Sequence, residues 1–183
     1  MDHRDIIANH EPTEVLGLAR HYLKDMIYGA NDGIITTFAV VSGVAGASLA
    51  NRIVIILGLA NLLADGFSMG ASNFLSIRSE EAARAADGRA PEEPFPVRHG
   101  LVTFAAFVLA GAVPLLAYLF DFGASEFSVS VIMTLVALFA VGASRALVTN
   151  VHWAPAGLEM LAVGAAAAAV AYAVGAWLAG LTE

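Results

Sequence analysis

The sequence contains no cysteine and few charged residues. The lack of cysteine excludes disulfide bonds and thiolate metal sites. Charged residues make up 14% and hydrophobic residues 58% of the 183 residues, whereas soluble domains average about 25% and about 45–50%. The net charge of −7 argues against a nucleic-acid-binding protein, because such proteins present basic surfaces. This composition predicts one domain embedded in a lipid bilayer.

Five apolar stretches are each long enough to cross a hydrocarbon core of about 30 Å at about 1.5 Å per residue. They cover residues 28–49, 53–77, 100–120, 128–148 and 156–180. The chain is therefore predicted to be an all-α integral membrane protein with five transmembrane helices. Its parts are a cytosolic segment with an amphipathic helix over Pro12–Lys24, a transmembrane hairpin, a short cytosolic loop and three further spans, at residues 1–26, 27–77, 78–98 and 99–183.

Basic residues predict the orientation, because loops rich in lysine and arginine stay in the cytosol. If the amino terminus is cytosolic, one basic residue, Arg52, falls on the far side of the membrane. The other eight fall on the cytosolic side: Arg4, Arg20, Lys24, Arg78, Arg84, Arg89, Arg98 and Arg145. The carboxyl terminus then lies on the far side, and the composition rich in alanine, glycine and arginine favours a bacterial plasma membrane.

Small residues in the spans predict close helix packing. Gly66 and Gly70 form a GxxxG pair on the second span, and Ser42 with Gly46 forms a similar pair on the first. Such pairs let helix backbones approach closely in lipid. An odd number of spans does not divide into two equal repeats, so we expect a pathway at the two-fold axis of a homodimer.

Two aspartates, Asp32 and Asp65, lie within the first two spans. A carboxylate near the centre of a spanning helix costs roughly 2.5–3.5 kcal/mol on insertion scales. Such groups seldom persist without a cation, a proton or a partner to offset that cost. We therefore expect the first two spans to handle a charged species inside the membrane.

The side chains around these aspartates form a predicted metal site. Asn61, Asp65 and Met69 are four residues apart, so they share one helix face. The first span offers Asp32, Thr36 and Asn31. Oxygen ligands suit hard divalent ions, and a thioether shifts the preference toward first-row transition ions. The spans lack histidine and cysteine, which argues against tight retention of Zn²⁺ or Cu²⁺. We expect Fe²⁺ or Mn²⁺ as a transported substrate exchanged for protons, and no permanently bound cofactor.

Each candidate ligand also has a structural interpretation. Asp32 belongs to an Asn-Asp-Gly sequence that is a turn signal, so it could cap a helix. Asp65 could hold helices together through a buried hydrogen bond, and Met69 could fill space in a core. Asn61 is better explained as a hydrogen-bond partner between helices than as a ligand. The depth of Asp65 makes a purely structural role hardest to accept there.

Acidic residues outside these two spans are secondary candidates. Glu159 is expected in the first turn of the fifth span, where the helix dipole favours an acid. Four acidic residues of the 78–98 loop are most simply a solvated face, with weak metal collection as the alternative: Glu80, Glu81, Glu92 and Glu93. His21 and Asp25 have helical spacing, which we interpret as ordinary surface.

Three stretches carry a resemblance to a known family. Residues 28–43 read YGANDGIITTFAVVSG, residues 59–70 read LANLLADGFSMG, and residues 157–161 read GLEML. In these stretches the chain resembles the vacuolar iron transporter family. The resemblance implies five spans, a homodimer whose ion path is lined by spans one and two at the dimer axis, and movement of Fe²⁺ or Mn²⁺ out of the cytosol against protons. It maps the family's span-one aspartate onto Asp32 and its span-two methionine onto Met69.

Two departures and two rival functions accompany this resemblance. An acidic residue of some members falls on Asn61, and Asp65 could supply the missing charge. The long glutamate-rich cytosolic domain of well-studied members does not fit into residues 78–98, so the chain resembles a reduced branch. One rival is a non-transporting scaffold or partner subunit whose acids only join helices. The remote one is an intramembrane aspartyl protease, although residues 63–66 lack the glycine that such proteases place two residues before the acid.

Overall fold

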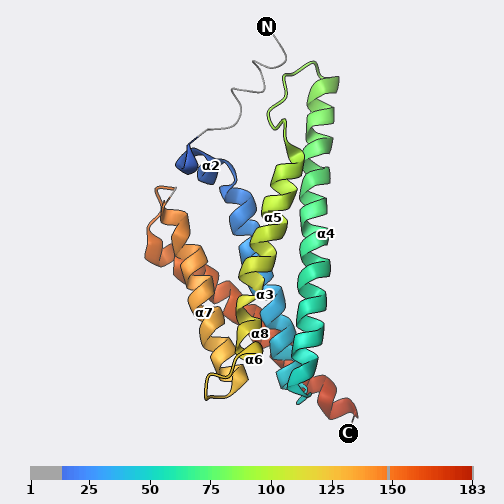
Figure 1. Cartoon of the computed structure of the whole chain (residues 1–183), viewed down its shortest axis with the longest axis vertical. Helices are drawn as coiled ribbons and strands as arrows, with labels where there is room; N and C mark the ends of the chain where they lie inside the picture. The colour runs from blue at the N-terminus through green and yellow to red at the C-terminus, as the bar shows by residue number, and fades with distance from the viewer. Residues whose placement is uncertain (1–13, 148, 183) are drawn as a thin grey trace.

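The computed structural model is all-helical over the residues that it describes, 14–147 and 149–182 (Figure 1). The helices form an elongated bundle in which α3 contacts α4, α5, α6, α7 and α8. In chain order they are α2 (Val15–His21), α3 (Leu23–Gly46), α4 (Asn51–Ala86), α5 (Pro96–Gly111), α6 (Val113–Leu119), α7 (Glu126–Ser144), the short 3₁₀ helix η1 (Arg145–Leu147) and α8 (Trp153–Thr182). The predicted all-α class is confirmed for these residues.

Three helical segments are long and apolar enough to cross a membrane: Asn51–Ala86, Glu126–Leu147 and Trp153–Leu181. The pair α5 and α6 adds a fourth if it forms one span. Helix α3 has 24 residues, which is sufficient length at about 1.5 Å per residue. It is not among the apolar candidates, because its amino-terminal half contains Lys24, Asp25, Asn31 and Asp32. Among the described residues, three of the five expected spans, or four if α5 and α6 form one span, therefore have the composition of membrane helices.

The expected third span over residues 100–120 is two helices that meet at an angle of 41°. The break lies at Ala112, two residues before Pro114. Proline has no backbone N–H and its ring collides with the carbonyl four residues earlier, so it bends or ends a helix. Leu115 N–H donates to the Ala112 carbonyl at 3.0 Å, a tighter turn than that of an α-helix. The span is thus bent by its own sequence.

The ends of the first two helices differ slightly from expectation. The amphipathic helix expected over Pro12–Lys24 is α2, which ends at His21, and Pro12 lies outside the described residues. Helix α4 continues to Ala86 and is 36 residues long, or about 54 Å. It therefore extends well beyond a hydrocarbon core of about 30 Å. Residues 78–86 of the expected cytosolic loop thus continue this helix, and residues 87–95 return the chain to α5.

Glycines bring α3 into direct backbone contact with α5. A Cβ atom added at Gly33 would lie 2.3 Å from the Phe107 carbonyl oxygen, and one at Gly29 would lie 2.4 Å from the Thr103 oxygen. From the opposite side, a Cβ at Gly111 would lie 2.6 Å from the Gly33 oxygen. No side chain fits at these separations, so glycine sets the distance between the two helices.

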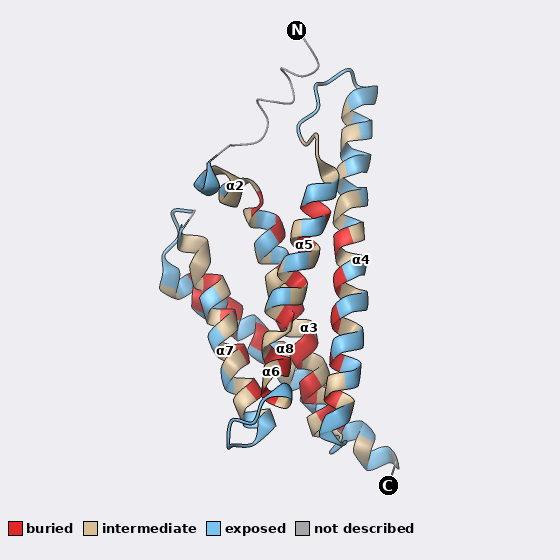
Figure 2. Cartoon of the chain, viewed as in Figure 1, coloured by how far each residue is buried: buried red, intermediate tan, exposed pale blue. Residues whose placement is uncertain are grey.

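The Gly66–Gly70 pair of α4 packs inside the chain. A Cβ at Gly70 would lie 2.7 Å from the Gly100 oxygen of α5, and one at Gly66 would lie 3.0 Å from the Phe107 ring. The buried residues of α4 recur along one stripe that faces α5: Val54, Gly58, Leu62, Gly66 and Gly70 (Figure 2). The opposite face of α4 is exposed in the single chain.

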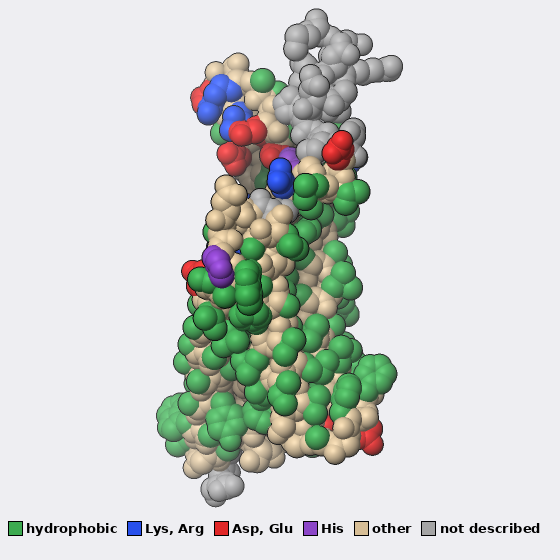
Figure 3. Space-filling view, turned by 90° about the vertical axis from the view of Figure 1, so that its left-hand side faces the viewer, with side chains coloured by type: hydrophobic (Ala, Val, Ile, Leu, Met, Phe, Trp, Pro, Cys, Tyr) green, Lys and Arg blue, Asp and Glu red, His purple; other side chains and the backbone are tan. Residues whose placement is uncertain are grey.

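Large apolar side chains cover much of the outer surface. On the face shown in Figure 3, hydrophobic side chains dominate most of the length, and most of the basic side chains gather at one end. Exposed examples on α4 include Leu59, Leu63 and Phe67, the last 70% exposed. A soluble monomer rarely exposes continuous apolar surface of this extent, so lipid or another chain must cover it.

Replacing Gly33 with alanine should destabilise the bundle, because the new methyl group has no space beside the Phe107 carbonyl. Overpacking of this kind costs about 1–3 kcal/mol. The matched control is Gly180→Ala on α8, where an added Cβ meets nothing within 4 Å. Thermal unfolding of the purified protein in detergent should show a lower midpoint for Gly33→Ala only. Equal midpoints for the two variants would contradict the packing described.

Candidate functional site

A cavity of about 450 Å³ lies between α3 and α4, and we name it the α3–α4 cavity. Its wall contains three carboxylates, one lysine, three hydroxyl groups of serine, a phenol, an amide and a thioether. The residues are Lys24, Asp25, Tyr28, Asp32, Asp65, Ser68, Met69, Ser72, Asn73 and Ser76. The cavity is therefore polar and acidic, although the bundle around it is apolar.

Helical periodicity brings these side chains to the cavity. On α3, Asp25, Tyr28 and Asp32 follow one another at spacings of three and four residues. On α4, Asp65 and Met69 begin a similar series that continues through Ser72 and Ser76. Residues three and four apart share a helix face, so each helix turns one polar face toward the cavity. Gly29 and Gly33 of α3 face α5 instead.

Three of the predicted ligands, Asp32, Asp65 and Met69, line this one cavity. Two ionised carboxylates in one cavity repel each other, and a cation or a proton between them relieves the repulsion. Met69 also packs against the apolar core. Its position therefore suits both interpretations made from the sequence, a metal ligand and a side chain that fills space in the core. The arrangement offers two carboxylates and a soft donor to a cation.

Three other predicted residues do not line the α3–α4 cavity. Asn61 lies one turn before Asp65 on α4 and is partly buried. The Thr36 hydroxyl donates to the backbone carbonyl of Asp32 at 2.8 Å, which is a local helix contact. The side-chain oxygen of Asn31 is buried and has no hydrogen-bond partner. In the single chain, these residues stand beside the site rather than in it.

Glu159 is not in the first turn of its helix, as the sequence suggested. Helix α8 begins at Trp153, which places Glu159 in the second turn. Its carboxylate pairs with Arg145 at 3.2 Å and its side chain is 69% exposed. The residue therefore ties α8 to η1 on the surface, and the helix-dipole interpretation is wrong.

A second cavity of about 250 Å³ adjoins the first, and we name it the mouth cavity. It shares Lys24, Asp25, Asn73 and Ser76 with the α3–α4 cavity. Its remaining wall is formed by His21, Ile77, Glu80, Glu81, Glu92, Glu93 and His99. The shared residues place the two cavities side by side, the mouth cavity next to the 87–95 loop and the α3–α4 cavity next to Asp32 and Asp65.

Glu81 holds the loop that returns to α5. Its carboxylate accepts the backbone N–H of Glu93 at 3.0 Å and that of Glu92 at 3.2 Å. Arg84 pairs with Glu92. Glu81 therefore has a structural role, because it anchors the loop to α4. Glu80 also lines the mouth cavity, and its side chain is exposed.

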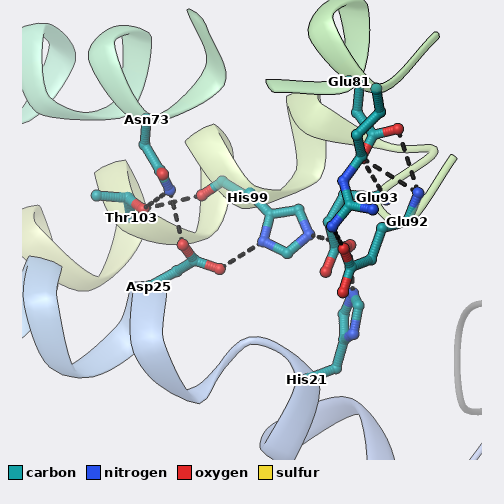
Figure 4. Close-up of polar contacts among 9 residues, drawn as sticks. His21, Asp25, Asn73, Glu81, Glu92, Glu93, His99 and Thr103 are labelled. Carbon is teal, nitrogen blue, oxygen red and sulfur yellow. Dashed lines mark hydrogen bonds and ion pairs between the residues drawn. The ribbon is translucent and has the colours of Figure 1, made fainter. Parts of the chain in front are cut away.

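Asp25 lies at the junction of the two cavities and is 5% exposed. One of its oxygens accepts a hydrogen bond from the Asn73 amide at 2.7 Å, and the other contacts His99 Nδ1 at 2.6 Å (Figure 4). Asn73 also donates to the Thr103 hydroxyl at 2.7 Å. A buried carboxylate is tolerated where its lone pairs are satisfied in this way. The contact joins α3, α4 and α5.

Local sequence patterns barely indicate this junction. The spacing of four residues between His21 and Asp25 suits any exposed helix and predicts ordinary surface. His99 precedes the expected third span by one residue and belongs to none of the motifs described above. The structure places His99 in the first turn of α5, and its ring is buried. A buried histidine opposite a buried aspartate depends on tertiary packing, which no local pattern shows.

Comparison with known sequences matches most of the chain to one protein family. A sequence model of the VIT family matches residues 23–93 and 82–176. The chain is 25% identical over 243 residues to a vacuolar iron transporter of Toxoplasma gondii, covering 96% of this chain and 80% of the relative. It is 28% identical over 218 residues to vacuolar iron transporter 1 of Arabidopsis thaliana, covering 87% of each. A shorter match, 49% identical over 59 residues, covers 22% of a vacuolar iron transporter of Plasmodium berghei.

Loss of the Asp25 carboxylate should destabilise the fold, because His99 and Asn73 would lose their buried partner. Breaking a buried pair costs about 3–5 kcal/mol. The control is Asp87→Ala, which breaks the exposed pair of Asp87 with Arg89 at a cost below about 1 kcal/mol. Thermal unfolding in detergent should show a large decrease for Asp25→Ala and little change for the control. Similar midpoints would show that the junction contributes nothing to stability.

Proposed function

The chain belongs to the VIT (vacuolar iron transporter) family, and from this membership we propose that it exports Fe²⁺ or Mn²⁺ from the cytosol across a membrane. The named relatives are iron transporters, and the α3–α4 cavity supplies donors that suit such an ion. Transporters of this family are not enzymes. The aspartyl protease interpretation is therefore excluded, and the scaffold remains as the rival.

The observation that carries the proposal is the meeting of Asp32, Asp65 and Met69 at one cavity. Carboxylates bind hard divalent ions, and the thioether favours first-row transition ions among them. The set lacks the histidine and cysteine that would hold such an ion tightly. Modest affinity suits transport, because an ion that enters must also leave.

The route begins on the cytosolic side and continues through the mouth cavity into the α3–α4 cavity. When the metal leaves, Asp32 and Asp65 are free to take protons, which returns the site to low charge inside the membrane. Metal and protons then move in opposite directions. In this account the two aspartates carry either one divalent cation or protons.

The proposal requires α3 to cross the membrane as well, which brings the number of spans to five. Its polar half is covered by α4 and α5, so its carboxylates face cavities and partners rather than lipid. Polar residues are tolerated at membrane depth when they line a cavity inside the bundle, and those of α3 meet this condition. The amino terminus is then cytosolic and the carboxyl terminus lies on the far side, in the plasma membrane of a bacterium.

A second copy of the chain completes the pathway. Ser68 and Ser72 line the α3–α4 cavity and are exposed in the single chain. Polar groups at membrane depth do not face lipid without a large cost. The apolar residue Leu75 follows Ser72 by three residues and Ser68 by seven, so it lies on the same face of α4, and it is 54% exposed. We therefore place the two-fold axis of a homodimer beside α4.

Metal flux into proteoliposomes tests the transport function. Wild-type protein should give saturable Fe²⁺ or Mn²⁺ uptake, with a matching movement of protons out of the vesicles. Asp32→Asn and Asp65→Asn should each reduce uptake by about tenfold or more, because charge-assisted contacts are worth about 1.5–3 kcal/mol. Glu159→Gln makes the same chemical change at an exposed carboxylate and should leave uptake unchanged.

Three outcomes of that experiment would contradict the proposal in whole or in part. Normal uptake in both aspartate variants would reject the assigned site. Wild-type vesicles that transport no divalent ion would favour the scaffold. Uptake with no proton movement would reject the exchange while keeping the metal path.

Single-cysteine cross-linking tests the dimer, because the natural chain has no cysteine and a new one is unique. Leu75→Cys, on the same face of α4 as Ser68 and Ser72, should form a covalent dimer in membranes upon oxidation. Val136→Cys on α7 is similarly exposed, at 64% against 54% for Leu75, and should remain monomeric. Equal cross-linking at both positions, or at neither, would contradict an axis beside α4.

A further inference from the structure

Three metal-ligating side chains from separate elements meet at the mouth cavity. His21 ends α2, Glu93 lies in the loop after α4, and His99 begins α5. One ligand atom from each lies within 4.8 Å of the others. Figure 4 shows the His99 ring between Asp25 on one side and Glu93 with His21 on the other. The sequence separates these residues by up to 78 positions, and the fold brings them together.

The contacts have the dimensions of a coordination sphere. Glu93 Oε2 lies 3.0 Å from His99 Nε2 and 3.3 Å from His21 Nε2. Two ligands about 2.1 Å from one ion, at angles of about 90–109°, lie about 3.0–3.4 Å apart. The three side chains can therefore hold one cation after small side-chain movements. Two imidazoles and one carboxylate also leave positions open for water.

A second set of contacts orients His99. Its Nδ1 lies 2.6 Å from Asp25 Oδ2 and its Nε2 lies 3.0 Å from Glu93 Oε2. When a cation takes the place of the proton on Nε2, Nδ1 keeps its proton and donates to Asp25, which leaves the Nε2 lone pair for the cation. Asn73 holds the other Asp25 oxygen, and the Thr103 hydroxyl donates to the His99 carbonyl at 2.9 Å. Metal-binding histidines commonly use the second nitrogen in this way, which fixes the ring and increases its basicity. An ordinary surface histidine has no such support.

We propose that His21, Glu93 and His99 form a capture site for a first-row divalent ion at the cytosolic end of the route. Its role as the first stop rests on the transport function proposed above. Imidazole nitrogen selects transition ions over Mg²⁺ and Ca²⁺, which prefer oxygen ligands alone. The α3–α4 cavity is rich in oxygen and discriminates less well. The capture site thus supplies selectivity before the ion passes Asp25.

Cobalt binding tests this site without any transport measurement. Co²⁺ bound by imidazole gives visible absorption bands, and the purified full chain in detergent should show them on titration. His21→Gln and Glu93→Gln change partly exposed side chains, with exposures of 16% and 31%, so the fold should persist. Each should weaken Co²⁺ binding by at least about tenfold, since even supporting residues of metal sites contribute 10–100-fold.

Matched controls show whether the loss of Co²⁺ binding is specific to the proposed ligands. His152→Gln and Glu159→Gln alter the same residue types outside the mouth cavity and should leave the absorption bands and the affinity unchanged. Asp65→Asn should also keep them, because it lies in the other cavity. Fe²⁺ should displace Co²⁺, and excess Mg²⁺ should not. Wild-type bands and affinity in both His21→Gln and Glu93→Gln, or the absence of bands in the wild type, would overturn the proposal.

Transport separates this inference from the function on which it rests. In proteoliposomes, Glu93→Gln should raise the metal concentration for half-maximal uptake and leave the maximal rate nearly unchanged, as expected when only binding is lost. Bands without flux in the wild type would reject the transport function and keep the site. Flux with unchanged half-saturation in Glu93→Gln would reject the capture role and keep the transport function.

Discussion

The position of α3 at the centre of the bundle is the constraint on which the rest of the structure depends. Gly29 and Gly33 bring its backbone against α5, so no side chain separates the two helices there. This contact fixes the rotation of α3 about its axis. Its polar side chains Asp25 and Asp32 are thereby directed toward α4 and the cavities. A helix too polar to count as an apolar span is kept in the bundle because its neighbours cover its charges.

Charge inside the bundle is distributed over two connected sites with different donors. The α3–α4 cavity offers mainly oxygen and one thioether, whereas the mouth cavity adds imidazole nitrogen. Asp25 belongs to both and is held by His99 and Asn73. Imidazole donors at the mouth and mainly oxygen donors within would let selection precede passage. The short 78–98 loop contributes Glu93 to the mouth, and Glu81 anchors that loop.

The sequence predicted the elements that depend on local periodicity. The shared face of Asp65 and Met69 followed from a spacing of four residues, and both line the cavity as that spacing requires. The sequence did not predict contacts between segments that lie far apart along the chain. His99 and Asp25 are 74 positions apart, and neither carries a local sign of its partner. Pro114 is itself a local signal for the bend beside it, but the continuous apolar run over residues 100–120 predicts a single span. Small-residue pairs predicted close packing, but which helix they meet is a property of the whole bundle.

The most direct test of the central claim is the location of a cation in the protein. Crystals or particles of the full chain loaded with Mn²⁺ would show the ion by its anomalous scattering or density. The account predicts an ion in the α3–α4 cavity within coordination distance of the Asp32 and Asp65 carboxylates, about 2.0–2.2 Å. A saturated protein with no ion near either aspartate, or with both carboxylates turned to bulk water, would contradict it.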